Sequence, residues 1–359
     1  LHPHDLKTSD YNYKKNFSPL MTEDKQNCSN TSEDNRHWSE GREKIGGYYG
    51  IRLMMFFYDY GGRTIFKLCL YPVMFFYYMF SKKQRDISKD FLLQVERIRS
   101  KKGLPQVHYS SFTHFMSFGS MLIDKINAWR GNIHLYREAV FMEDSEEVFY
   151  AYEKESRGKI LLCSHLGNVD ALRALGTKKD TRAPEVYSVF FTKNAQNFNN
   201  ILKAISNDAQ LNIIATDSIG PDTALKLSEI IENKGMIAIV GDRTPVKENS
   251  QKKSASAKLK EPERVCEVDF LGRKAYLPQG AFILASLLKC SVQCLFALKN
   301  EKTGKIEIFC SDLFDEVKLP RKNKEEALKE YVQKYAELLE YFALRYPYQW
   351  FNFFEFFRK

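Results

Sequence analysis

The residues best suited to chemistry are His165 and Asp170, in the stretch SHLGNVD that runs from Ser164 to Asp170. A histidine oriented by a carboxylate can act as a general base: the carboxylate fixes the ring tautomer, and the other ring nitrogen takes a proton from a substrate hydroxyl. On one continuous helix, two residues with this spacing would point apart. We therefore expect His165 on a loop that folds the imidazole back onto Asp170, just inside the helix that follows.

The elements on either side of this motif would position the pair. The apolar run 160–163 follows a glycine and is typical of a short buried strand. Beyond the motif, apolar residues recur at helical spacing from Val169, and Asn168 is a suitable N-cap for that helix. Asp170 would lie in its first turn, where a carboxylate suits the helix dipole. The motif is therefore predicted to lie at a strand-to-helix corner.

The rest of the chain alternates short β-rich runs with helical patterns. Strands are predicted at 186–191, 211–215, 236–240, 292–298 and 306–309. Helices are predicted at 88–98, 112–126, 197–205, 221–233, 279–288 and 324–344. This alternation predicts an α/β fold, with a mostly parallel (mixed) central sheet and helices on both faces. Ligands of such sheets bind outside the carboxyl ends of the strands, which is where His165 is expected.

Two other predicted strands also end in polar residues. The run 186–191 leads to Lys193 and Asn197, and the run 236–240 leads to Asp242 and Arg243. All three corners could face one crevice. Lys193 is either a solvated loop residue or a ligand of substrate. Asp242 and Arg243 either form an ordinary ion pair in a turn or place a permanent cation at the active edge of the sheet.

Composition narrows the possible partners. The net charge of +9 suggests an anionic partner: a phospholipid surface, an acidic carrier protein or nucleic acid. No nucleic-acid-binding motif supports the last of these, so we expect no nucleic-acid partner. The seven cysteines are scattered without a C-x2-C pair, which indicates neither a disulfide framework nor a zinc site. Reduced thiols in a cytoplasmic compartment are the simplest interpretation.

The chain is predicted to contain three parts. Residues 1–44 are polar and form a disordered tail, residues 45–87 form a helical hairpin, and residues 88–359 form the catalytic domain. The insertion 247–264 is basic and low in apolar residues, so we expect a mobile surface loop, either solvated or in contact with acidic partners. A closing helix, 324–344, leads into residues 346–357, here called the aromatic tail, and the two are expected to complete the core.

Most of the predicted hairpin is the aromatic-rich stretch 51–80, which is broken at Gly61 and Gly62. It could pack as a buried helical pair or dip into one leaflet of a membrane. We favour membrane contact, because so many large aromatic side chains beside basic residues suit an interface better than a dry core. The basic stretch 81–85 would then meet anionic lipid.

The motif SHLGNVD resembles the H-x4-D/E signature of the lysophospholipid acyltransferase superfamily, in the branch that contains the bacterial lipid A late acyltransferases. Lys193 and Asn197 stand where that branch usually has Arg-Pro-x-x-Asn, and GDRTPV begins at Gly241. FLGRKAYLPQGAFILASLL at 270–288 and PYQWFNFFEFF at 347–357 resemble a predicted acyltransferase subgroup of that branch. The resemblance covers roughly residues 36–359.

The resemblance implies transfer of an acyl group from a thioester, on acyl carrier protein or coenzyme A, to a hydroxyl of a lipid or glycolipid precursor. His165 would be the general base and Asp170 its orienting partner. It also implies a mixed seven-stranded sheet between helices, no metal or redox cofactor, and a place at the cytoplasmic face of the bacterial inner membrane. Substrate contacts are expected from these residues: Ser164, Gly167, Asn168, Lys193, Asn197, Asp242 and Arg243.

The residue at 193 departs from the family pattern. A lysine cannot present the planar fork of the usual arginine, so Arg243 becomes the better candidate for an anionic acceptor.

Two rival functions remain open. Ser164 could be the nucleophile of a lipid hydrolase, although adjacent Ser and His side chains on an extended strand point to opposite faces and no G-x-S-x-G elbow is present. Alternatively, the protein could bind lipid without catalysis, although the intact pair of His165 and Asp170 argues against this.

Overall fold

The structure is a computed structural model that describes residues 46–151, 155–176, 184–191, 212–216, 220–243, 265–354 and 356–357. The predicted tail 1–44, the predicted helix 197–205 and the basic insertion 247–264 lie outside these residues. Lys193 and Asn197 lie outside them as well.

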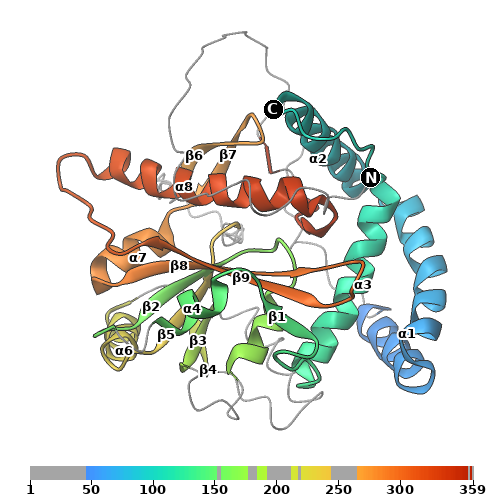
Figure 1. Cartoon of the computed structure of the whole chain (residues 1–359), viewed down its shortest axis with the longest axis horizontal. Coiled ribbons are helices and arrows are strands. Elements are labelled where there is room, and N and C mark those ends of the chain that lie inside the picture. The colour runs from blue at the N-terminus through green and yellow to red at the C-terminus, as the bar shows by residue number, and fades with distance from the viewer. Residues whose placement is uncertain are drawn as a thin grey trace, which may run out of the picture.

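A seven-stranded sheet in the order β1-β9-β8-β2-β5-β3-β4 forms the centre of the molecule (Figure 1). The strands from β8 to β4 all run parallel, whereas β9 pairs antiparallel with β8 and β1 runs parallel to β9. The chain is therefore an α/β protein with a mixed, mostly parallel sheet, as the sequence predicts. The strands are β1 (Ala139–Phe141), β2 (Lys159–Cys163), β3 (Val186–Phe191), β4 (Asn212–Thr216), β5 (Met236–Val240), β8 (Ser291–Lys299) and β9 (Ile306–Phe314).

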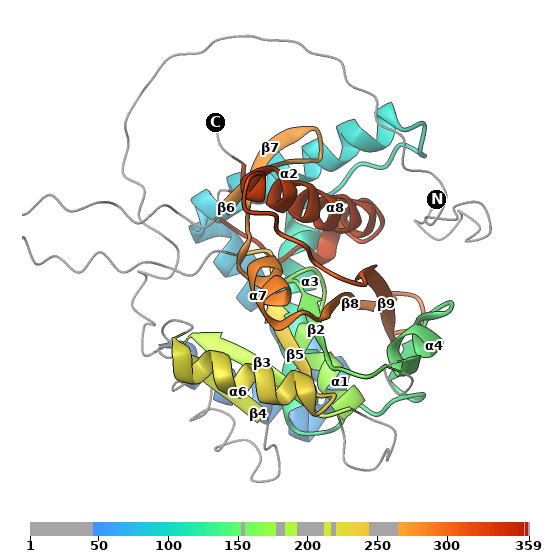
Figure 2. The same ribbon diagram turned by 90° about the vertical axis from the view of Figure 1, so that its left-hand side faces the viewer.

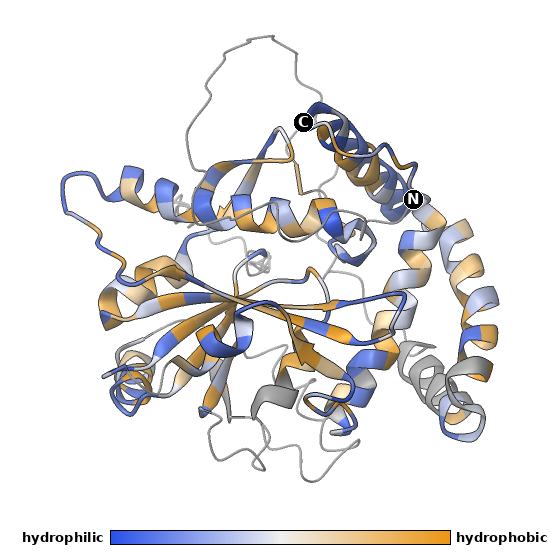
Figure 3. Ribbon diagram, viewed as in Figure 1, coloured by the Kyte–Doolittle hydropathy of each residue, from blue (hydrophilic) through white to orange (hydrophobic). Residues whose placement is uncertain are grey.

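Helices cover both faces of this sheet (Figures 1 and 2). The larger core joins one face to α6, α7, α8 and α2, and the smaller core joins the other face to α4, η5 and the end of α3. Figure 3 shows that the strands between them are mostly apolar. The helices are α1 (Gly46–Phe80), α2 (Lys82–Lys101), α3 (Ser111–Trp129), α4 (Ser145–Tyr150), η5 (Val169–Gly176), α6 (Pro221–Glu232), α7 (Gly280–Leu288), α8 (Lys324–Arg345) and η6 (Pro347–Gln349).

A two-stranded hairpin that the sequence analysis missed lies on the far side of α8 from the sheet (Figure 1). Its strands, β6 (Val265–Phe270) and β7 (Arg273–Pro278), are joined by Leu271 and Gly272, both with positive φ. The side chain of Gln333 on α8 hydrogen-bonds to both the backbone N–H and the carbonyl of Asp269. Helix α8 is therefore covered on two sides, which explains why Tyr335 and Leu339 are fully buried.

Helix α1 lies outside the sheet and packs along α3. Its backbone kinks at Gly62, where φ is 64° and ψ is −164°; the predicted hairpin is not confirmed. Phe66, Leu70 and Met74 are buried against α3, while the outer face leaves many large apolar side chains exposed. Among the residues that the structure describes, no helix combines the length and the apolar character needed to cross a membrane.

Candidate active site

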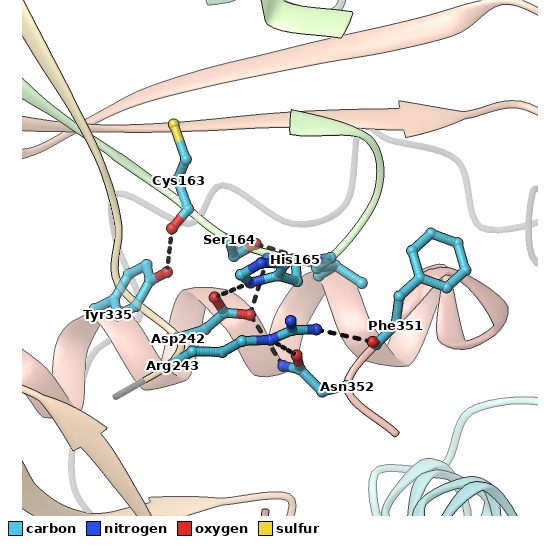
Figure 4. Close-up of polar contacts among 9 residues, drawn as sticks. Cys163, Ser164, His165, Asp242, Arg243, Tyr335, Phe351 and Asn352 are labelled. Carbon is cyan, nitrogen blue, oxygen red and sulfur yellow. Dashed lines mark hydrogen bonds and ion pairs between the residues drawn. The ribbon is translucent and has the colours of Figure 1, made fainter. Parts of the chain in front are cut away.

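The imidazole of His165 is paired with the carboxylate of Asp242 (Figure 4). Nδ1 of His165 lies 2.8 Å from Oδ1 of Asp242, and the backbone N–H of His165 donates to Oδ2 at 2.8 Å. With the Nδ1 proton donated to the carboxylate, Nε2 carries the lone pair, and no described residue hydrogen-bonds to it. The side chain of His165 is 31% exposed, whereas that of Asp242 is fully buried. The pair therefore has a basic nitrogen that a substrate can reach.

Strand order explains this pairing. Strands β2 and β5 are parallel neighbours, and Cys163, the last residue of β2, is in register with Val240, the last residue of β5. His165 and Asp242 each follow two residues later, so they leave the same edge of the sheet side by side. The backbone N–H of Gly241 extends the ladder by donating to the carbonyl of Cys163 at 2.9 Å. A Cβ at residue 241 would lie 2.5 Å from Cδ1 of Leu162, so a larger residue there would have to displace that buried side chain.

The prediction that Asp170 orients His165 is wrong. Its carboxylate forms an ion pair with Lys125 of α3 at 3.0 Å. The cause is local: after Gly167 the chain turns into the short 3-10 helix η5, which packs on α3 and carries Asp170 with it. Asp170 therefore joins η5 to α3, and Asp242 takes the orienting position that the sequence analysis gave to Asp170.

The buried carboxylate of Asp242 is well compensated. Burial raises its pKa, but the proximity and hydrogen bonds of His165 and the charge of Arg243 outweigh burial, so the pKa is lowered overall. A third hydrogen bond comes from Nδ2 of Asn352, 3.0 Å from Oδ2. Asp242 therefore remains ionised at neutral pH and can stabilise a positive charge that develops on His165.

Asn352, in the aromatic tail, is a residue of the candidate site that the sequence analysis missed. Its amide donates to Asp242 and its Oδ1 accepts from Nε of Arg243 at 2.6 Å, so it bridges the two residues (Figure 4). The tail approaches the site further through the N–H of Phe351, which donates to the carbonyl of His165 at 3.3 Å. The only sequence signal was the segment PYQWFNFFEFF, which carries a resemblance but assigns no role to Asn352.

Arg243 contacts the aromatic tail. Besides its bond to Asn352, its Nη2 donates to the carbonyl of Phe351 at 3.0 Å, and its guanidinium lies 5.5 Å from the ring centre of Phe354. Burial lowers the pKa of Arg243, and the nearby carboxylate of Asp242 opposes that change. These contacts assign Arg243 a structural task, and its contact with an anionic acceptor stays a prediction.

The three other predicted residues of the corner differ in accessibility and bonding. Ser164 is 2% exposed, and its Oγ accepts a hydrogen bond from the N–H of Leu166 at 3.2 Å. Gly167 has a φ of 83°, and a Cβ there would lie 2.2 Å from the carbonyl oxygen of Ala297. These contacts give Ser164 and Gly167 local structural tasks, and the burial of Ser164 disfavours a nucleophilic role.

Asn168 is the exception at this corner. Its backbone N–H donates to the carbonyl of Ala297, but neither atom of its buried side-chain amide forms a hydrogen bond. The prediction that its side chain caps the following helix is therefore wrong: η5 begins instead with a backbone bond from Ala171 to the Asn168 carbonyl. A buried amide without a partner is costly to the fold, so Asn168 calls for an explanation.

Two other chemistries were considered for the described part of the chain. It contains no group of three or more metal-ligating side chains. Burial raises the pKa of the Cys163 thiol to about 12, so this cysteine beside the site is not a thiolate nucleophile. The pairing of Nδ1 of His165 with the Asp242 carboxylate suits proton transfer through Nε2.

Comparison with known proteins adds no family assignment. No protein-family model matches the chain, and no curated protein matches its sequence.

Proposed function

We propose that the protein is an O-acyltransferase of the kind found in the lysophospholipid acyltransferase superfamily. The observation that carries the proposal is the pair of His165 and Asp242 at the carboxyl edge of a mostly parallel sheet, with Nε2 of the imidazole accessible. The donor is an acyl thioester on acyl carrier protein or coenzyme A, and the acceptor is a hydroxyl of a lipid or glycolipid precursor. No metal or redox cofactor takes part in this scheme.

The proposed reaction uses His165 as base and then as acid. Nε2 takes the proton of the acceptor hydroxyl while its oxygen attacks the thioester carbonyl carbon, giving a tetrahedral intermediate. The intermediate collapses with cleavage of the C–S bond, and the leaving thiolate takes the proton back from His165. Asp242 stabilises the imidazolium between these two steps, and Asn352 fixes the carboxylate.

Substrate contacts beyond the pair are part of the same proposal. Asn168 offers a buried amide with free hydrogen-bonding capacity, three residues along the chain from the base. Lys193 and Asn197, outside the described residues, would contact the thioester or the acceptor.

We also propose that the protein works at a membrane surface, at the cytoplasmic face of a bacterial inner membrane. Exposed large apolar side chains gather on α1, among them Tyr60, Leu68, Phe76 and Phe80, each more than half exposed. Several large apolar side chains exposed on one helix are typical of a membrane or partner interface. A lipid acceptor explains why a catalytic protein would carry such a surface.

The test is an acyl-transfer assay with purified protein, a radiolabelled palmitoyl thioester on either carrier, and a bacterial lipid extract as acceptor. Wild type should form a labelled lipid, which mass spectrometry identifies. His165→Ala should lower the rate by about 10²–10⁴-fold, the usual loss when a positioned base is removed. His108→Ala is the matched control, because that side chain is 94% exposed and pairs with Glu96 of α2. Wild-type turnover by folded His165→Ala protein would overturn the proposal.

A further inference from the structure

A groove of about 660 Å³ lies between α2, the start of β7 and the aromatic tail. Its volume falls within the usual range of small-molecule sites, about 300–1,000 Å³. One wall is aromatic and consists of Phe91, Trp350, Phe354, Phe356 and Phe357. Phe91, Trp350 and Phe356 are buried, so an aliphatic chain in the groove would pack chiefly on the half-buried rings of Phe354 and Phe357, and each methylene that it buries would contribute about 0.8 kcal/mol.

The described residues that line the groove also include charged side chains, three basic and two acidic. Arg273 and Asp90 neutralise each other in an ion pair of 2.6 Å, and the Arg273 guanidinium also lies 4.4 Å from the ring centre of Phe357. Among the described residues that line the groove, Lys82 and Lys83 are also exposed, and Asp86 is the other acidic side chain. Charge complementarity therefore favours an anionic group at the lysine end.

The groove continues from the exposed apolar face of α1. That helix ends at Phe80, and α2 begins at Lys82, so the lysines directly follow the exposed side chains of Met79 and Phe80. The corner is fixed by Arg85, whose Nη1 donates to the carbonyls of Tyr78 and Met79 at 2.9 and 3.3 Å. A lipid taken from a bilayer that α1 contacts would thus meet the groove without crossing water.

We propose that this groove binds an anionic phospholipid, with the phosphate at Lys82 and Lys83 and one acyl chain against the aromatic wall. Asn352, the residue that donates to Asp242, also lines the groove. The bound lipid would therefore lie one side chain away from the proposed catalytic pair. The site extends the proposed function by giving the lipid class that the enzyme takes from the membrane, but binding itself does not depend on acyl transfer.

Trp350 lines the groove and provides the measurement. In the full-length variant Trp38→Phe/Trp129→Phe, Trp350 is the remaining tryptophan. We would titrate this protein with vesicles of phosphatidylcholine and phosphatidylglycerol in which only one of the two lipids carries brominated chains. Brominated phosphatidylglycerol should quench Trp350 strongly and brominated phosphatidylcholine weakly. Equal quenching by the two lipids, or none at saturating vesicle concentration, would overturn the proposal.

A charge-reversal pair separates the groove from general attraction to an anionic surface. Lys82→Glu/Lys83→Glu should raise the lipid concentration needed for half-maximal quenching about tenfold more than Lys89→Glu/Arg97→Glu does. The second variant makes the same charge change at exposed positions of α2 outside the groove. Identical losses in the two variants would show that the groove lysines bind no lipid. Should the tryptophan variants fail to fold, photoactivatable phosphatidylglycerol with wild-type protein should label peptides from residues 350–357, and labelling elsewhere alone would refute the site.

The outcome is independent of catalysis. His165→Ala should quench like wild type, because His165 does not line the groove. Quenching in a protein that shows no acyl transfer would support the lipid site and contradict the proposed acyltransferase activity. Acyl transfer without quenching would support the activity and contradict the lipid site.

Discussion

At the scale of single residues, the carboxylate of Asp170 is close to His165 in the sequence, whereas that of Asp242 is close to it in space, and the two have different partners. Asp242 accepts from Nδ1 of His165, while Asp170 pairs with Lys125. Asp242→Asn should lower kcat by about 10²–10⁴-fold, because an amide neither fixes the productive tautomer nor stabilises the imidazolium. Asp170→Asn should keep kcat within a few-fold of wild type and lower thermal stability slightly. Steady-state kinetics and thermal melts of both proteins measure this.

The matched exchange of Asp for Asn makes that comparison strict, since both changes remove one charge and keep the side-chain size. A larger loss of kcat in Asp170→Asn than in Asp242→Asn would restore Asp170 as the orienting partner.

Asn168 permits a second prediction at this scale. An unpaired buried amide costs about 1–3 kcal/mol, so an apolar side chain of similar size should be tolerated or should stabilise the fold. We expect Asn168→Leu to keep or raise the free energy of unfolding in urea while it lowers kcat/KM by at least about tenfold. Loss of stability with unchanged kcat/KM would mean that the amide serves the fold alone.

The sequence was sufficient to place His165 just beyond the carboxyl end of a parallel strand, because a polar corner after a short apolar run is a local signal. It was not sufficient to find the partner of His165. Asp242 lies 77 residues further along the chain, and its proximity depends on β2 and β5 being neighbours, a fact of strand order that no local pattern carries. Asn352, 110 residues beyond Asp242, reaches the site only through tertiary packing of the tail.

At the scale of elements, the same contrast holds. Residues 186–191 and 236–240 were predicted as strands with the observed bounds, because β-rich runs between turn residues are a local signal. Strands β6 and β7 were missed, since their alternating side chains are stabilised by contact with α8. The corner after Asn168 became a 3-10 helix because Gly167 and its contact with Ala297 set the direction of the chain.

The aromatic tail is fastened to α3 by a buried histidine, which gives a pH prediction. Nε2 of His114 lies 2.8 Å from the carbonyl of Trp350, and Nδ1 lies 3.0 Å from Oγ of Ser88. Burial lowers the pKa of His114 to about 4, although the bond to Trp350 opposes this. Between about pH 6.5 and pH 4, His114 is protonated in the unfolded chain but stays neutral in the folded protein. The stabilisation from the neutral buried His114 is therefore fully present above about pH 6.5 and is lost as the pH falls towards 4.

We expect the unfolding free energy of wild type to fall by about 2 kcal/mol more than that of His114→Gln between pH 7.5 and pH 5. The glutamine amide can still donate to Trp350 but does not titrate. Urea denaturation of both proteins at the two pH values measures the difference, and parallel pH dependences would show that His114 is not buried as the neutral form.

At the scale of the whole molecule, helix α1 buries one set of apolar side chains against α3 and exposes another set on its outer face. Phe66, Leu70 and Met74 face α3, whereas Leu68, Phe76 and Phe80 are at least 65% exposed. Leu68→Ser/Phe76→Ser/Phe80→Ser should weaken binding to lipid vesicles roughly 100-fold, because each side chain loses about 1 kcal/mol or more of apolar transfer. The melting temperature should change little.

Sedimentation with vesicles measures that binding. Phe66→Ser serves as the opposite control, because it should lower the melting temperature through the core. Unchanged sedimentation of the triple variant would mean that the outer face of α1 does not contact lipid.

Because His165, Asp242 and Asn352 lie far apart along the chain, they are synthesised at different times. A ribosome adds about 5–20 residues each second, and it makes the three residues in that order. His165 is made long before β5 brings the carboxylate of Asp242, and that carboxylate is made before the tail brings the amide of Asn352. If the proposed function holds, a nascent chain can present α1 to a membrane early, while the proposed catalytic site is completed only after synthesis has passed residue 352.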